Sequence, residues 1–315
     1  TKSLIKIKLV LLPRVYLNEF NKRIIIMPIF DTHCHYNLEP LYSGQAIYFD
    51  IDENDPILQK NWRDHWQTAQ KNGIKQALIP GAGLTSSRLA VDIAQQEPNL
   101  YASVAIHPLR VAKIDFASAT EEIEKLSQNQ AVVAIGETGL DYFHLAKEDS
   151  EKVNNIKQDQ ERLFINHIQL ASQNQLTLIV HVRDEGEAAY WRILEILDQY
   201  WPAEENIIFH CLSGPIAYVK KAMKIKHSYF GFDGNLTFKN AHYLRELFQL
   251  LNQQSPDKIL LETDAPYLAP TPYRGQICQP VMIGELANFV EKDLAGNLEQ
   301  IYQNSLRAFK LENNG

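Results

Sequence analysis

The segment Ile29-Phe30-Asp31-Thr32-His33-Cys34-His35 is the most informative part of the chain about its architecture, because it joins a short apolar run directly to a polar segment. The first strand of an open, doubly wound α/β sheet usually leads into a glycine-rich phosphate-binding turn. Here the strand leads instead into a His-X-His pair. Residues two apart on an extended chain point to the same side, so His33 and His35 should project together while Cys34 points away. This beginning disfavours the open sheet.

Further apolar runs follow and alternate with segments of helical period. The predicted strands lie at 29–31, 76–79, 101–106, 132–135, 177–180, 206–209, 228–232 and 258–261. The predicted helices lie near 59–72, 84–97, 117–129, 154–174, 186–200, 214–226, 239–252, 280–295 and 297–311. Continuous apolar runs are typical of strands buried on both faces of a parallel sheet. Eight strand–helix units at this length predict an α/β fold, a single (β/α)8 TIM barrel with an extra C-terminal helix.

The composition excludes several classes of protein. With 315 residues, 45% hydrophobic and 22% charged, the chain is close to the globular average and is not a disordered or low-complexity sequence. A net charge of −7 gives no overall basic field, so a nucleic-acid substrate would have to be held locally. Three cysteines form no disulfide framework and indicate a cytoplasmic protein. No apolar run is long enough to span a membrane.

Residues 1–26 differ from the rest of the chain. They contain six basic residues and one acidic residue, a net charge of +5, and their short apolar run is broken by Pro13. We predict that 1–26 is an N-terminal extension outside the fold, and that residues 27–315 form the barrel domain.

Polar residues interrupt the apolar pattern at the carboxyl ends of five predicted strands. They are four histidines and two carboxylates, namely His33, His35, Glu137, His181, His210 and Asp264. In a (β/α)8 barrel this end carries the active site, because the βα loops surround it. Two carboxylates buried together would repel one another unless a cation lay between them. Imidazole and carboxylate ligands suit zinc, manganese and related divalent ions, so the pattern predicts a metal site.

Six ligands are more than one catalytic ion takes from a protein, since a position must stay open for water. Two ions about 3.5–4 Å apart that share a carboxylate would use the whole set. Glu137 is central in strand order and is the predicted bridge. Asp264 is predicted to hold one ion and to orient or deprotonate the attacking water. Glu137 and Asp264 are therefore the predicted catalytic residues, and the predicted cofactor is two divalent ions (Mg²⁺, Mn²⁺ or Zn²⁺).

Five segments together resemble the TatD family of metal-dependent deoxyribonucleases, which belongs to the amidohydrolase-like barrels. They are FDTHCH (30–35), GETGLDYF (136–143), HVRDE (181–185), FHCLSG (209–214) and LLETDAPYLAP (260–270). The resemblance runs from residue 27 to about residue 311. It implies a TIM barrel that hydrolyses DNA phosphodiester bonds at a divalent metal centre, often as a 3′→5′ exonuclease. It also implies that the six residues above are the metal ligands, with Asp264 as catalytic base, and that the substrate is DNA, at strand ends or as single strands. Nothing in the sequence indicates an obligate protein partner.

Three further residues are candidates for substrate binding. His107 lies in Ala105-Ile106-His107-Pro108, which resembles the family's Gly-Ile-His-Pro stretch. Arg183 and Arg274 offer guanidinium groups that bind phosphate in a bidentate fashion. Glu262, two residues before Asp264, is expected to support the site rather than to bind metal.

Two segments concern the choice of substrate. Residues 274–280 read Arg-Gly-Gln-Ile-Cys-Gln-Pro, where the family usually has an Arg-Gly-Lys-X-Asn-Glu-Pro type run. The segment 37–56 is long and acidic, and its aromatic residues Tyr42, Tyr48 and Phe49 are candidates for stacking a nucleobase.

Two other functions remain open from the sequence. One is an amidohydrolase-type enzyme that cleaves an amide, ester or lactone in a small molecule. Such relatives commonly bridge their metals with a carbamylated lysine on the fourth strand, where this chain has Glu137 and no nearby lysine. The other is a weakly active scaffold that keeps metal for stability.

Overall fold

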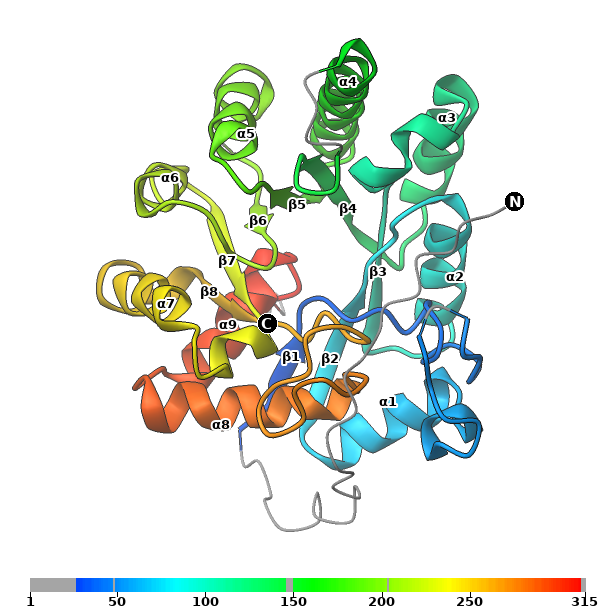
Figure 1. Cartoon of the computed structure of the whole chain (residues 1–315), viewed down its shortest axis with the longest axis vertical. Helices are drawn as coiled ribbons and strands as arrows, with labels where there is room; N and C mark the ends of the chain where they lie inside the picture. Colours follow the sequence, from blue (N-terminus) through cyan, green and yellow to red (C-terminus); the bar gives the residue numbers. More distant parts are fainter. Residues whose placement is uncertain (1–26, 48, 146–149, 203, 313–315) are drawn as a thin grey trace.

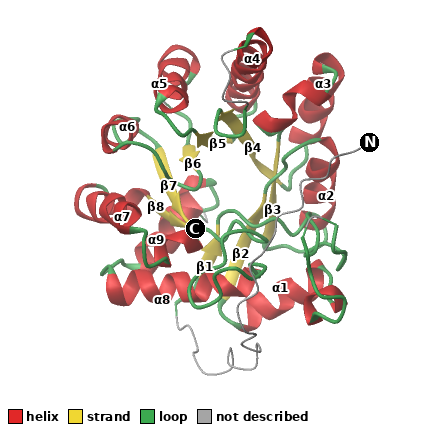
Figure 2. Ribbon diagram, in the orientation of Figure 1, coloured by secondary structure: helices red, strands yellow, loops and turns green. Residues whose placement is uncertain are grey.

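Eight parallel strands lie at the centre of the molecule, with helices around them (Figures 1 and 2). The structure is a computed structural model that describes residues 27–47, 49–145, 150–202 and 204–312, so the predicted extension 1–26 lies outside the described residues. The strands are β1 (Ile29–Asp31), β2 (Ile74–Ile79), β3 (Leu100–Val104), β4 (Val132–Asp141), β5 (Thr177–Arg183), β6 (Ile207–Phe209), β7 (Ser228–Phe232) and β8 (Ile259–Leu261). The predicted set of strands is confirmed.

The strands follow one another around the barrel in chain order, from β1 to β8, and each pair of neighbours is parallel. Backbone contacts just beyond the strands complete the circle between β8 and β1. The Thr32 N–H donates to the Leu261 carbonyl at 3.1 Å, and Cys34 forms a parallel bridge with Ala265. The predicted (β/α)8 barrel is therefore confirmed.

Helices link the strands and cover the outside of the barrel (Figure 2). They are α1 (Trp62–Lys71), α2 (Leu84–Ala94), α3 (Phe116–Ser127), α4 (Glu151–Gln173), α5 (Ala188–Tyr200), α6 (Ile216–Ala222), α7 (His242–Gln254), α8 (Ile283–Asp293) and α9 (Leu298–Ala308). Short 3₁₀ helices lie at Pro56–Gln59, Pro108–Lys113, Gly234–Thr237, Pro256–Lys258 and Pro280–Met282. None of these described helices has the length and apolar composition needed to cross a membrane.

Side chains that cap the first turn mark the beginning of several of these helices. Asn61 and Asp64 form a capping box at α1, in which each side chain accepts a hydrogen bond from a free backbone N–H of the first turn. Asp115 and Asn297 cap α3 and α9 in the simpler way, with one side-chain oxygen.

The interior of the barrel is filled with apolar side chains at the amino ends of the strands. One cluster contains an inward-facing residue from most strands together with Phe309, which follows α9: Phe30, Leu78, Ala134, Ile179, Ile208, Tyr229, Leu260, Ala308 and Phe309. The Phe309 ring lies 5.4 Å from the Phe30 ring, and Thr177 Oγ1 donates to the Ala308 carbonyl at 2.6 Å. Residues at the end of α9 and directly after it therefore close this end of the barrel, and we call the opposite end, at the carboxyl ends of the strands, the mouth.

Candidate metal centre

The segment after β1 brings His33 and His35 to the mouth. The Asp264 N–H donates to the His33 carbonyl at 2.9 Å, and the His35 N–H donates to the Ala265 carbonyl at 2.9 Å. The segments that follow β1 and β8 therefore run side by side. Cys34 packs in the hydrophobic core, away from the two histidines, as the alternation predicts. Asp264 has a left-handed backbone (φ 51°), which is uncommon for a residue other than glycine.

A bulge in β4 positions Glu137. Between Ile135 and Thr138 the register of β4 against β5 shifts, so that one extra residue is accommodated. Such a bulge re-aims a side chain without ending the strand. β4 continues to Asp141, so the prediction that this strand ends at residue 135 was wrong. Gly139 has a φ of 141°, and a Cβ there would lie 2.0 Å from the His181 carbonyl oxygen, so this position requires glycine.

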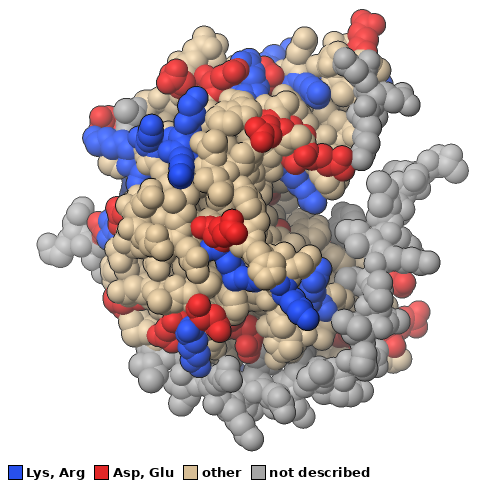
Figure 3. Space-filling model, turned by 60° about the vertical axis from the view of Figure 1, so that its left-hand side comes forward, with Lys and Arg blue, Asp and Glu red and all other residues tan. Residues whose placement is uncertain are grey.

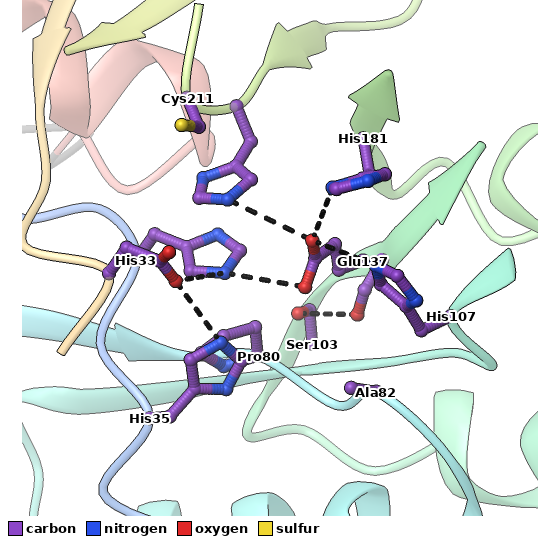
Figure 4. A network of polar contacts seen from close by, with 12 residues as sticks. His33, His35, Pro80, Ala82, Ser103, His107, Glu137, His181 and Cys211 are labelled. Atoms are coloured by element: carbon purple, nitrogen blue, oxygen red, sulfur yellow. Dashed lines mark hydrogen bonds and ion pairs between the residues drawn. The ribbon is translucent and has the colours of Figure 1, made fainter. Parts of the chain in front are cut away.

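Glu137 lies at the centre of a group of imidazoles (Figure 4). Its Oε1 is 2.8 Å from His181 Nδ1 and 3.8 Å from His210 Nε2. Its Oε2 is 3.7 Å from His33 Nε2. The two oxygens of one carboxylate therefore face different sets of histidines, which is the arrangement expected of a carboxylate that bridges two cations.

Asp264 completes the cluster on the side of His33 and His35. Its Oδ1 lies 3.4 Å from His35 Nε2 and 3.9 Å from His33 Nε2. A continuous set of short contacts thus joins all six residues that the sequence singled out as ligands. They come from five different strands or from the segments that directly follow them.

Several buried nitrogen atoms of this cluster lack a hydrogen-bond partner, as atoms that bind a cation would. Both ring nitrogens of His33 are buried without a hydrogen-bond partner, and so is Nδ1 of His35. The His33 and His210 rings lie face to face with centroids 3.6 Å apart and an interplanar angle of 16°. Ligand atoms of His33, His35 and Glu137 all lie within 4.8 Å of one another. Since buried polar atoms are normally paired, these orphaned nitrogens are consistent with ligands of divalent ions.

Electrostatics keeps both acids of the cluster ionised. Burial raises the pKa of Glu137, but His107, His181 and His33 together outweigh it and hold that pKa well below the usual range. Burial also raises the pKa of Asp264, and here the contact with His35 and the nearby His210 leave it lower than usual. Ionised carboxylates are the form that binds a divalent cation.

Two more carboxylates contact candidate histidine ligands, each at the ring nitrogen that does not face Glu137. Glu262 Oε1 lies 2.9 Å from His210 Nδ1, and Asp141 Oδ2 lies 3.2 Å from His181 Nε2. Carboxylates in this position fix the tautomer and orientation of a metal-binding imidazole. The supporting role expected of Glu262 agrees with this contact. A Cβ at Gly231 would lie 2.3 Å from Glu262 Oε2, so glycine in β7 makes room for the carboxylate.

The sequence reasoning missed Asp141. It lies four residues after Glu137 and enters the site only because β4 extends past the bulge. Asp141 also contacts Nδ1 of His144 at 2.8 Å, a histidine that the strand-end pattern left out. Burial raises the pKa of Asp141, but His181 and His144 outweigh it and lower that pKa to about 2. The available signal was the GETGLD segment itself, in which two glycines stand close to two carboxylates.

His107 lies beside the centre, with Nε2 3.5 Å from Glu137 Oε1. Its Nδ1 accepts a hydrogen bond from the Leu109 N–H at 3.2 Å. The neutral ring must therefore carry its proton on Nε2, where it faces Glu137 as a donor. This tautomer suits a residue that donates to substrate or to Glu137 rather than a metal ligand.

The two arginines predicted to bind substrate are exposed, and each stacks on an aromatic ring. The guanidinium carbon of Arg183 lies 4.2 Å from the centroid of the Phe143 ring, and that of Arg274 lies 4.2 Å from the centroid of the Phe238 ring. Neither forms an ion pair with Glu137 or Asp264. Arg183 ends β5 at the mouth, and Arg274 lies in the segment between β8 and α8.

Comparison with known proteins assigns this chain to a family. The family model described as TatD related DNase matches residues 30–310. A Mycoplasma pneumoniae protein described as an uncharacterized metal-dependent hydrolase is 34% identical over 90% of this chain and 100% of its own length. A Bacillus subtilis protein described as the uncharacterized metal-dependent hydrolase YabD is 29% identical over 90% of this chain and 99% of its own length.

Solved structures show the same fold. The Escherichia coli TatD homologue YJJV superposes with a TM-score of 0.72 and 20% identity, covering 91% of this chain and 98% of that chain. A TatD family hydrolase from Entamoeba histolytica gives a TM-score of 0.72 with 18% identity, covering 90% and 99%.

Proposed function

This chain belongs to the TatD-related DNase family of metal-dependent hydrolases, and from that premise we propose that it cleaves DNA phosphodiester bonds from the 3′ end of a strand. The proposed centre holds two divalent ions between His33, His35, Glu137, His181, His210 and Asp264. We place the protein in the cytoplasm, a proposal supported by the absence of a disulfide bond among its three cysteines.

One observation carries the proposal, namely that Glu137 presents its two oxygens to different histidines. Oε1 faces His181 and Oε2 faces His33. Two-ion centres are typical of enzymes that cleave phosphodiesters, because one ion assists the attacking oxygen and the other the leaving oxygen. The family description, TatD related DNase, supports the same substrate class.

Bound divalent ions would lower the pKa of a water molecule and neutralise charge on the phosphate. The protein's own residues supply the rest of the mechanism. Asp264, ionised because its pKa is below the usual range, accepts the proton of the attacking water. His107 carries its proton on Nε2 and donates toward the charge that develops near Glu137. Glu262 and Asp141 keep the rings of His210 and His181 from rotating.

The electrostatic surface favours a short or terminal substrate over a long duplex. Lysine and arginine side chains are interspersed with aspartate and glutamate on the face seen in Figure 3, and the chain as a whole carries −7. Affinity for a long polyanion scales with the number of phosphates that cations neutralise. Arg183 and Arg274 at the mouth supply local positive charge to the end of a strand.

The test compares three substrates with the purified protein in Mn²⁺ and in excess chelator. They are single-stranded DNA labelled at the 5′ end, the same strand with phosphorothioate linkages at its 3′ end, and an activated lactone. We expect metal-dependent shortening of the first strand from its 3′ end and protection of the second. Hydrolysis of the lactone alone would overturn the DNase proposal in favour of a small-molecule hydrolase. Activity that persists in chelator would overturn the metal mechanism.

A further inference from the structure

Large apolar side chains are exposed mainly around the mouth. Six of them are at least about one third exposed among the described residues: Ile47, Leu109, Phe143, Tyr200, Ile216 and Tyr243. Three of them, Ile47, Leu109 and Phe143, lie on segments that join a strand to the next helix, and Ile216 and Tyr243 lie in the first turns of α6 and α7 at the same end of the barrel. Of these six, only Tyr200, at the end of α5, lies at the opposite end. An exposed apolar side chain is ordinary on its own, but a concentration around a polar site indicates a surface that contacts a ligand.

Among these six residues, Phe143 is the one whose ring is stacked against a cation. It is 37% exposed and follows β4 by two residues. The Arg183 guanidinium lies over its ring at 4.2 Å, and Arg183 forms no ion pair with any carboxylate among the described residues. The ring and the guanidinium plane thus form a short stack that presents both a π-face and a positive charge.

The backbone and a neighbouring side chain fix this stack in place. The N–H groups of Tyr142 and Phe143 both donate to the Arg183 carbonyl, at 2.8 and 3.3 Å. The His144 and Phe143 rings are packed edge to face, with centroids 5.0 Å apart and an interplanar angle of 79°. A rigid aromatic surface loses little conformational entropy when a ligand binds to it.

The stack is attached directly to the metal centre. Asp141 holds His144 at 2.8 Å on one side and His181 at 3.2 Å on the other. His181 and Arg183 are two residues apart on β5 and therefore point to the same side of the strand. Glu137, His181, Asp141 and His144 thus form one chain of contacts that ends at the Phe143 ring.

We propose that Phe143, backed by Arg183, is a stacking platform for an unpaired nucleobase of the strand that enters the centre. This inference rests on the proposed function and narrows its substrate to strands with unpaired ends, because a base must leave the duplex to stack on protein. Bases stack on aromatic rings and on arginine planes with little dependence on sequence. The phosphate next to that base then lies near the Arg183 cation.

The structure also excludes another stacking residue that the sequence offered. Phe49 is 7% exposed and packs against Tyr267 with ring centroids 5.7 Å apart. Tyr42 is partly buried against the core, and Tyr48 lies outside the described residues. Base stacking is therefore assigned to Phe143 rather than to Phe49.

The experiment separates base stacking from attraction to the backbone. Binding of fluorescent oligothymidylate and of an abasic oligomer with the same number of phosphates is measured by anisotropy in chelator, where no cleavage occurs. KM and kcat for both oligomers are then measured in Mn²⁺. The variants are Phe143→Leu, Phe143→Trp and, as a matched control with similar exposure (39%), Tyr200→Leu. Circular dichroism and melting confirm that each variant folds.

We expect Phe143→Leu to lower the preference for the base-containing oligomer roughly 5- to 150-fold, which corresponds to about 1–3 kcal/mol for one stacked base. Affinity for the abasic oligomer should not change. KM for oligothymidylate should rise with kcat preserved, since stacking acts on ground state and transition state alike. Phe143→Trp and Tyr200→Leu should retain the wild-type preference.

Two outcomes would overturn the inference, and they can be told apart. If the wild-type protein cleaves DNA and Phe143→Leu keeps its base preference, or loses affinity for both oligomers equally, Phe143 is not a stacking platform and the proposed function stands. If the wild-type protein neither binds nor cleaves either oligomer, the proposed function itself fails and the platform fails with it.

Discussion

Replacing Glu137 by glutamine tests the bridging carboxylate with the smallest change of shape. In the wild-type protein Oε1 faces His181 at 2.8 Å and His210 at 3.8 Å, while Oε2 faces His33 at 3.7 Å. Glutamine keeps one acceptor oxygen and replaces the other with an amide that only donates. Whichever way the amide turns, one set of imidazoles loses the oxygen that would share its cation.

The expected magnitudes follow from the loss of one ligand and one charge. We expect Glu137→Gln to bind at most one ion per chain where the wild type binds two. If the shared ion contributes about 4 kcal/mol of transition-state stabilisation, the rate falls roughly 10³-fold. At a metal concentration about 100 times Kd, one site stabilises the fold by about 2.7 kcal/mol, so Mn²⁺ should raise the Tm of the wild type by at least roughly 5–10 °C. The variant should show less than half of that rise.

Three measurements on the same preparations provide the check. They are metal content after equilibrium dialysis against Mn²⁺, the Tm with and without Mn²⁺, and the rate of DNA cleavage. Glu122→Gln makes the same chemical change on the outer helix α3, where Glu122 pairs with Arg88 at 2.9 Å, and should behave as wild type. A Glu137→Gln protein that holds two ions and turns over at the wild-type rate would refute the bridging role.

Three other substitutions examine how the fold supports the site. Glu262→Gln removes the negative charge that lies 2.9 Å from His210 Nδ1. Metal affinity, measured by calorimetry, should fall roughly 10- to 100-fold. Unchanged affinity would mean that Glu262 does not orient the His210 ring. Burial lowers the pKa of His167 from its ordinary value of 6.5 to about 3. Below pH 6.5 the unfolded chain therefore binds a proton at His167 that the folded protein does not bind, and the free energy of unfolding falls as the pH falls toward 3. Between pH 7 and pH 4.5, the free energy of unfolding of the apoprotein, measured with urea, should fall by about 2–3 kcal/mol more for the wild type than for His167→Gln. The same pH dependence of the free energy of unfolding in both proteins would contradict this. Gly139→Ala should destabilise the folded protein by at least about 1–3 kcal/mol, because Gly139 has a positive φ of 141°. The control Gly186→Ala should leave stability unchanged, because its Cβ would have no neighbour closer than 3.9 Å. Equal urea midpoints for the two variants would count against a strained bulge.

The local pattern of the chain was enough to predict the strands and the shared direction of His33 and His35. The apolar runs of β7 and β5 are buried along nearly their whole length, as strands covered on both faces must be. The alternation around Cys34 predicted that His33 and His35 share a side, because that property depends only on the geometry of an extended backbone. These predictions are confirmed, since they involve neighbours along the chain.

Properties that depend on pairing between distant segments could not be predicted in this way. The bulge at Glu137 exists because β4 must match the register of β5, some forty residues later, and the position of Asp141 follows from it. The choice between Phe49 and Phe143 as the exposed ring depends on Tyr267, which covers Phe49 from the far end of the chain.

The amino-acid sequence was sufficient to predict the kind of fold, the six candidate ligands and the chemistry they suit, because apolar periodicity and residue type are properties of each residue and its neighbours. The folded structure was needed to show that Glu137 faces His33 with one oxygen and His181 with the other, and that Asp141 and Glu262 contact the rings of His181 and His210. Closing the barrel brings residues more than 200 positions apart, such as His33 and Asp264, to within 3.9 Å, and no local pattern encodes that distance.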